Sequence, residues 1–129
     1  MTSSAVTPVV KQLTQEQIGR YADASGDHNP IHVDEAFARN TPFGGTIAHG
    51  MLVLASISEM MAKGFGEAWL TGGRLRVRLR APARPGDTIT ASARPQAARD
   101  SAVLVYAVEC RNQQGELLIS GTAEVPAGG

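Results

Sequence analysis

The stretch AHGMLVLASISEMMAK, residues 48–63, is the most apolar segment of the chain. Its apolar side chains recur at helical spacing and cover more than one face of the expected helix: Met51, Leu52, Leu54, Ala55, Ile57, Met60 and Met61. A helix that is apolar on most sides is usually buried in a core, and Lys63-Gly64 supplies a stop signal. At about 1.5 Å per residue this helix is on the order of 22 Å long, so covering it requires strands of similar length.

The second half of the chain has the pattern of such strands. Residues 74–80 read RLRVRLR, a strict alternation that places Leu75, Val77 and Leu79 on one face of a strand. Strand patterns also occur at residues 88–94, 102–111 and 117–125, with turns at PARPGD (82–87) and NQQG (112–115). This order predicts an α+β fold in which one curled antiparallel sheet wraps around the apolar helix.

The first half is expected to hold a short strand, a helix and a long loop. Residues 9–13 form the strand, and Thr14 with Gln17 forms a capping box that starts the helix. The helix ends at Ser25-Gly26, and its core-facing side is expected to carry Ile18, Tyr21, Ala22 and Ala24. Beyond an irregular segment, residues 34–39 make one or two helical turns with Phe37 inward, and residues 40–45 form a loop.

Length, charge and cysteine content limit the classes of protein to consider. The 129 residues contain no repeat or linker, so we expect a single domain over residues 1–129 with loose tails at 1–8 and 126–129. A formal net charge of zero gives no reason to expect a nucleic acid or membrane partner. The single cysteine, Cys110, excludes an internal disulfide, and no signal peptide or membrane span is apparent, so a cytoplasmic protein is expected.

Asp27 and His32 are the first candidates for chemistry. A carboxylate and an imidazole held close together can bind one water and exchange protons with it at neutral pH. Pro30 stiffens the link between them. Spacing alone nevertheless favours a structural role, in which Asp27 caps a turn and His32 is an ordinary loop histidine. His28 and His32 also have the spacing of two zinc ligands on a helix, but Pro30 lies between them and no further ligand pattern follows, so no metal is expected.

His49-Gly50, at the start of the apolar helix, is the second candidate. A helix start offers unpaired N–H groups, and Gly50 would let a substrate oxygen approach closely enough to form an oxyanion hole. Close packing of the helix start explains the glycine equally well. Further along, Ser58 could hydrogen-bond a catalytic group, although such a serine more often bonds its own helix. No pattern surrounds a serine or Cys110 that would make it a nucleophile.

Arginines form a third feature, because Arg74, Arg76, Arg78 and Arg80 share one face of a strand and Arg84 follows. A guanidinium pairs well with phosphate, so this row could hold the phosphates of a nucleotide-bearing substrate. A solvated strand face is the preferred interpretation for most of the four.

Three blocks of this sequence resemble the MaoC-like (R)-specific enoyl-CoA hydratases. Residues 25–34, SGDHNPIHVD, fit the family pattern S/T-G-D-x-N-P-[LIV]-H-x-D throughout. Residues 46–51, TIAHGM, resemble the block that opens the central helix, and residues 81–88, APARPGDT, resemble the turn P-V-x-x-G-D. The resemblance extends over roughly residues 13–125. It implies a hotdog fold, a homodimer whose sheets join edge to edge, and no cofactor.

The resemblance also implies a reaction. Asp27 and His32 would hold a water that adds across the double bond of a trans-2-enoyl thioester in fatty acid metabolism, or is removed in the reverse dehydration, while the N–H of Gly50 polarises the thioester carbonyl. Asn29, His49 and Ser58 would support this site, and Arg78, Arg80 and Arg84 would contact coenzyme A phosphates. Three alternatives remain: a dehydratase for acyl carrier protein thioesters, a hotdog thioesterase using Glu59 as its carboxylate, and a non-catalytic acyl-CoA binder.

Overall fold

The computed structural model describes residues 6–98 and 100–128. In chain order the elements are β1 (Val9–Gln12), α1 (Gln15–Ser25), α2 (Pro30–Val33), α3 (Glu35–Arg39), α4 (Gly50–Phe65), α5 (Glu67–Gly72), β2 (Arg74–Leu79), β3 (Thr88–Gln96), β4 (Val103–Arg111) and β5 (Leu117–Pro126). Parts of the expected loose tails, residues 1–5 and 129, lie outside the described residues. The remainder is ordered in part, because β5 runs through Pro126 and the Ala127 amide donates to the Ala102 carbonyl.

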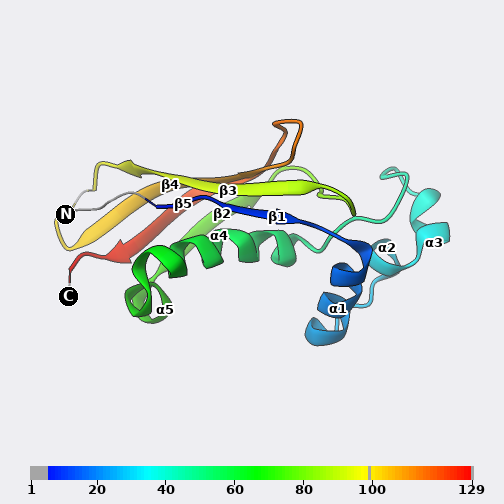
Figure 1. Ribbon diagram of the computed structural model, residues 1–129, viewed down its shortest axis with the longest axis horizontal. Helices are drawn as coiled ribbons and strands as arrows, with labels where there is room; N and C mark the ends of the chain where they lie inside the picture. Colours follow the sequence, from blue (N-terminus) through cyan, green and yellow to red (C-terminus); the bar gives the residue numbers. More distant parts are fainter. Residues whose placement is uncertain (1–5, 99, 129) are drawn as a thin grey trace.

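One antiparallel sheet forms the upper layer, and its strand order is β1-β3-β4-β5-β2. The sheet curls over α4, which lies along its concave face (Figure 1). Strands β2 and β1 are the two edges of the sheet, and β2 pairs with β5 alone, from Arg74 opposite Glu124 to Leu79 opposite Ile119. The predicted α+β architecture with a sheet around a central helix is therefore confirmed.

The core lies between α4 and the sheet. The helix contributes Val53, Ile57, Met60 and Met61, and the sheet contributes residues such as Ile89, Ala91, Tyr106, Val108, Leu118 and Val125. The prediction that α4 is buried on most sides is wrong for its outer face, where Met51 is 61% exposed and Ala55 is exposed. The physical reason is that the sheet covers only one side of the helix in a single chain.

Helices α1, α2 and α3 lie together beyond the N-terminal end of α4, and α5 lies near its other end (Figure 1). Helix α1 begins as expected, because the Thr14 hydroxyl accepts from the Gln17 amide, and it ends at Gly26 in the left-handed conformation. The reciprocal half of the expected capping box is missing, since Oε1 of Gln17 has no hydrogen-bond partner. This helical group positions the loop that holds Asp27 next to the start of α4.

Several local predictions differ from the structure. Ala24 and Phe37 are exposed, because α1 buries Ile18 and Ala22 and α3 buries only Ala38. Helix α4 starts at Gly50 and continues one residue past the expected stop at Lys63-Gly64, to Phe65, where Gly66 ends it. Helix α5 was not expected from the sequence. Its buried residue, Trp69, is accommodated by Gly73, where a Cβ would lie 2.3 Å from the indole.

Candidate active site

Asp27 and His32 face each other across a short gap. The Oδ2 atom of Asp27 lies 3.9 Å from Nε2 of His32, and both residues line a pocket of about 220 Å³. The Asp27 side chain is 55% exposed and the His32 side chain is 11% exposed. The gap is too long for a direct hydrogen bond and allows one water to contact both groups.

The loop fixes the Asp27 carboxylate through its other oxygen. The Asn29 amide donates to Oδ1 of Asp27 (3.2 Å), and the Asp27 amide donates to the Ser25 hydroxyl (3.2 Å). Asn29 in turn caps α2, because its Oδ1 accepts from the Ile31 amide (3.0 Å). These short-range bonds form because Asp and Asn side chains readily bond the main chain two residues further on. They leave Oδ2 of Asp27 directed toward His32.

His32 is held from two sides by more distant parts of the chain. Its Nδ1 lies 2.8 Å from the Ile47 carbonyl, and its own carbonyl accepts from the Gln15 amide group (2.9 Å). A carbonyl can only accept, so Nδ1 carries the proton and Nε2 presents a lone pair to the gap. In this tautomer the two groups that face each other, Nε2 and a carboxylate oxygen, are both acceptors. A water with two O–H donors therefore fits between them.

A side-chain network extends this support. The Thr46 hydroxyl donates to Oε1 of Gln15 (2.7 Å), and the Thr46 amide donates to Oε1 of Glu35 (3.2 Å). Thr46 is buried, and the adjacent Ile47 amide bonds the Ile31 carbonyl (3.2 Å). No local pattern predicted these roles of Gln15 and Glu35, because Thr46 lies 31 residues from the first and 11 residues from the second.

His49 is buried beside this pair. It is 3% exposed, its Nε2 lies 3.0 Å from the Asp27 carbonyl, and its ring stacks on His32 with centroids 3.8 Å apart. Tyr21, which the sequence assigned to the core, is half-buried and meets the His49 ring edge-on (4.8 Å between centroids). The three rings make one wall of the pocket that holds Asp27 and His32.

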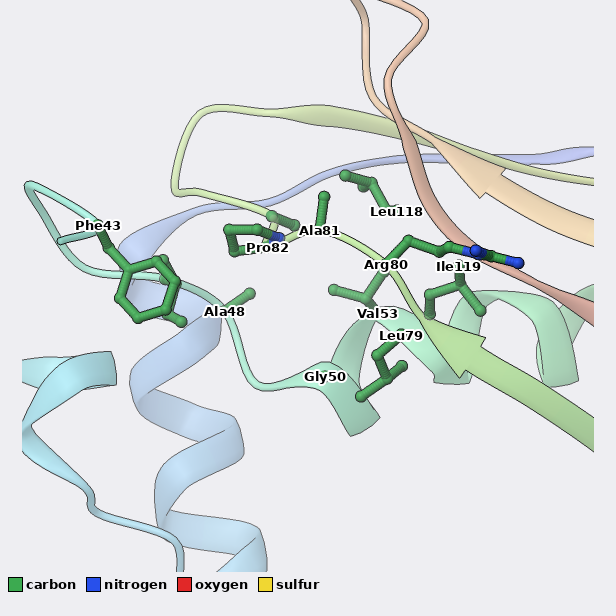
Figure 2. A pocket seen from close by; sticks show the side chains of 12 residues that line it. Phe43, Ala48, Gly50, Val53, Leu79, Arg80, Ala81, Pro82, Leu118 and Ile119 are labelled. Atoms are coloured by element: carbon green, nitrogen blue, oxygen red, sulfur yellow. The ribbon is translucent and has the colours of Figure 1, made fainter.

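Gly50 joins this polar pocket to an apolar one. It lines both the pocket at Asp27 and a cavity of about 290 Å³ whose lining is almost entirely apolar. Figure 2 shows the apolar cavity between the start of α4, Phe43 and the chain after β2, including Ala81 and Pro82. Because α4 begins here, the amides of Gly50 and Met51 precede the first hydrogen bond inside the helix. Leu52 and Trp69 line neither pocket.

Three other residues that were considered from the sequence line neither pocket: Ser58 as a supporting residue, His28 as a metal ligand and Glu59 as the carboxylate of a thioesterase. Ser58 is not among the residues that line either pocket, and its hydroxyl accepts from the indole N–H of Trp69 (3.0 Å). His28 also lies outside the polar pocket and bonds Asp23 (2.9 Å). Glu59 forms ion pairs with Lys11 (2.7 Å) and Lys63 (3.1 Å). Hydrogen bonds from these two ammonium groups lower the pKa of the Glu59 carboxyl.

The three arginines expected to contact phosphate are exposed, and two of them have protein partners. Arg80 lines the apolar cavity and donates to the Ser120 hydroxyl (2.9 Å), while Arg84 donates to the Phe43 carbonyl (2.7 Å). Arg78 lies on the same strand face as Arg74 and Arg76. Arg80 therefore lines the cavity, Arg84 bonds a residue that lines it, and Arg74, Arg76 and Arg78 lie along the edge strand.

Asp27, His32 and His49 can each offer one ligand atom within 4.8 Å of the others, which raises the question of a metal. The lone pair of an imidazole nitrogen lies in the plane of its ring. Two stacked rings, here with an interplanar angle of 23°, therefore cannot both direct their lone pairs at one ion. The geometry suits a bound water better than a metal ion.

Comparison with known proteins shows which family the chain belongs to. The family model described as MaoC like domain matches residues 3–114. The chain belongs to the MaoC-like family. A relative within this group, the (R)-specific enoyl-CoA hydratase of Aeromonas caviae, is 33% identical over 119 residues, which cover 89% of this chain and 87% of that protein.

Two further comparisons place the MaoC-like chain among its relatives. It is 40% identical over 85 residues to 3-hydroxyacyl-thioester dehydratase Z of Mycobacterium tuberculosis, and this match covers 62% of the chain but only 56% of the dehydratase. The solved structure of the (R)-hydratase from A. caviae involved in PHA biosynthesis superposes with a TM-score of 0.83 at 26% identity, covering 98% of each chain. The fold is accordingly the hotdog fold. Among the described residues, no helix is long and apolar enough to cross a membrane.

Proposed function

We propose that this protein catalyses the (R)-specific hydration of trans-2-enoyl-CoA to (R)-3-hydroxyacyl-CoA, or the reverse dehydration. The observation that carries the proposal is the 3.9 Å gap between Oδ2 of Asp27 and Nε2 of His32, in which two acceptors face each other. Support also comes from the relatives named as hydratases and dehydratases of acyl thioesters.

In the proposed step the water between Asp27 and His32 attacks the third carbon of the enoyl thioester. The bond from the water oxygen to this carbon forms while one water proton passes to the Asp27–His32 pair. The second carbon then receives a proton from the same pair, on the same face, and the double bond is lost. Asp27 is the expected base and His32 its partner in proton delivery, within one coupled pair. The step needs no cofactor.

Gly50 is proposed to activate the thioester. As water adds, negative charge develops on the carbonyl oxygen, and the N–H at the start of α4 stabilises it together with the positive end of the helix dipole. Since Gly50 also lines the apolar cavity, a carbonyl bound there would place its acyl chain among apolar side chains. Asn29 supports the site through Asp27. Ser58 is the least supported of the proposed residues, since it lines neither pocket.

Arg78, Arg80 and Arg84 are proposed to contact the phosphates of coenzyme A. If they do, replacing Arg80 or Arg84 with alanine raises KM for crotonyl-CoA and leaves KM for crotonyl-pantetheine, which lacks the nucleotide, unchanged. Equal increases for both substrates would count against the phosphate contact. The same comparison using a crotonyl thioester of acyl carrier protein separates the two carriers.

A homodimer is proposed, in a cytoplasmic protein. The β2 edge pairs with β5 only, and exposed apolar side chains lie on β2 and at the start of α4, namely Leu79 (59%) and Met51 (61%). Pairing of two β2 edges would satisfy the strand and cover these side chains. Light scattering of the purified protein gives the mass directly, and Leu79→Glu should shift a dimer toward monomer.

A thioesterase is the main alternative. It would rely on Glu59, but that carboxylate is paired with two lysines and its pKa is lowered, which makes it a weaker base. Purified protein incubated with crotonyl-CoA tests both functions at once. Hydration removes the ultraviolet absorbance of the conjugated thioester and gives (R)-3-hydroxybutyryl-CoA, whereas thioester cleavage releases a free thiol. Thiol release without hydration would overturn the proposal, as would binding with neither product.

A further inference from the structure

We infer that His49 is a positioning residue that fixes the distance between Asp27 and His32; this inference rests on the proposed function. Its Nε2–H donates to the Asp27 carbonyl at 3.0 Å, and its ring stacks on His32. His49 thus has a hydrogen bond to one member of the pair and a ring contact with the other.

The first argument concerns the unfavourable free energy of burying a histidine at position 49. Nδ1 of His49 is buried and has no hydrogen-bond partner, and the residue is only 3% exposed. An unsatisfied buried acceptor is unfavourable, and a phenylalanine of similar shape would fill the same space without it. The feature of histidine that this position uses is therefore its Nε2–H, and the bond to the Asp27 carbonyl is what offsets the cost.

The second argument concerns where both halves of the site are anchored. The ring of His32 bonds the Ile47 carbonyl, and the main chain at Asp27 bonds the side chain of His49. These anchors are two residues apart on one extended segment, which is itself fixed where the Ala48 amide bonds the Ala83 carbonyl (2.8 Å). Residues 47–49 therefore anchor both the main chain at Asp27 and the ring of His32, and so set the position of the carboxylate relative to the imidazole.

The third argument concerns the Asp27 loop. The Asp27 side chain is 55% exposed, and the hydrogen bonds that shape its own turn involve residues 25 and 29, inside the same loop. The His49 bond joins this turn to the buried start of α4. Without it, the loop would keep its local shape but lose its position relative to His32.

Two substitutions at position 49 test the hydrogen bond to Asp27 and the ring contact with His32 separately. His49→Phe keeps the stacked ring and removes the donor, whereas His49→Gln keeps a donor near the Nε2 position and removes the ring. With crotonyl-CoA, His49→Phe should lower kcat about 100-fold with KM little changed, since a displacement near 1 Å is enough for such a loss. His49→Gln should recover most of that kcat. His28→Phe, a loss of the exposed histidine that bonds Asp23, is the matched control and should retain wild-type kcat.

Amide hydrogen exchange supplies a second readout that needs no catalysis. Exchange at residues 27–29 should be faster in His49→Phe than in the wild type or His49→Gln, with the exchange of α4 unchanged. Unchanged exchange and unchanged kcat in His49→Phe would overturn the inference. If the wild-type protein hydrates no enoyl thioester, the proposed function fails, and the exchange result still decides whether His49 holds the loop.

Discussion

Gly50 and Leu79 are so close that a Cβ on Gly50 would lie 2.7 Å from Cδ1 of Leu79. The packing explanation for this glycine therefore holds, and the proposed role in binding the carbonyl concerns the same position. Leu79 lies at the end of the edge strand β2, and both residues line the apolar cavity. A ligand bound in the cavity at the start of α4 would therefore lie next to both Gly50 and Leu79.

Gly50→Ala is expected to harm activity more than stability. The clash involves the end of a flexible, 59% exposed leucine side chain, so the fold can relax at a cost of about 1 kcal/mol or less. The displaced leucine and the new methyl group would both intrude on the carbonyl site, so kcat/KM for crotonyl-CoA should fall about tenfold or more. Urea unfolding and steady-state kinetics measure the two effects separately.

Leu79→Ala is the control for this prediction. In the Leu79→Ala background the clash is gone, so Gly50→Ala should cost less stability than it does in the wild type. Activity should stay low if the methyl group blocks the carbonyl site itself. Full recovery of activity in the double variant would show that Gly50 serves packing alone.

Ser58→Ala is expected to destabilise the protein through Trp69. The indole N–H of Trp69 would lose its acceptor while the residue remains 7% exposed, which costs about 1–3 kcal/mol. Trp69 is the only tryptophan, so its fluorescence reports the change in its surroundings as well as unfolding. An unchanged free energy of unfolding would contradict this account of the contact.

A double-variant cycle that combines Ser58→Ala with Trp69→Phe tests the same hydrogen bond without leaving the indole N–H unpaired. Loss of both partners should cost less than the sum of the two single losses, because no buried N–H is left unpaired. Since phenylalanine leaves space next to Gly73, some loss of packing remains in both variants that carry it.

The ion pairs of Glu59 predict a pH-dependent contribution to stability. Its folded pKa lies below the ordinary value of 4.5, chiefly because Lys11 and then Lys63 hydrogen-bond the carboxylate. The contribution is therefore fully present above the unfolded pKa and is lost as the pH falls through the folded pKa. Glu59→Gln should lower the urea midpoint at neutral pH, and the difference from wild type should shrink as the pH falls below 4.5.

The same Glu59→Gln variant bears on the choice of function. Hydration of crotonyl-CoA should proceed at the wild-type rate, because Glu59 is not among the residues lining the pocket at Asp27. A loss of thioester cleavage in this variant, with hydration absent in both proteins, would instead favour the thioesterase alternative.

Much of the fold was predictable because its signals are local. The apolar stretch predicts α4, and alternation predicts β2 to β5 within two residues at each end. Helix α5 was not predictable in the same way, because it has six residues and glycines at both ends. The exposure of Met51 depends on how far the sheet reaches around α4, which periodicity along one helix cannot indicate.

The candidate site shows the same difference between features with a local sequence signal and features that depend on packing. Spacing alone favoured a structural role for Asp27 and His32, and the resemblance of residues 25–34 to the family pattern is what paired them; the two side chains do lie close together. Gln15 was not predicted as a support, and His49 was predicted as one without the contact it makes, since the bonds from Gln15 to His32 and from His49 to Asp27 span 17 and 22 residues. Such contacts depend on how α1 and the start of α4 pack against the loop.

The central claim is that Asp27 and His32 add water to an enoyl thioester, and kcat for crotonyl-CoA in Asp27→Asn and His32→Gln tests it most directly. Positioned acid–base groups contribute about 10²–10⁴-fold each, so both variants should lose activity by at least about 100-fold, with circular dichroism and urea midpoints close to wild type. Near-normal kcat in both well-folded variants would contradict the proposed mechanism.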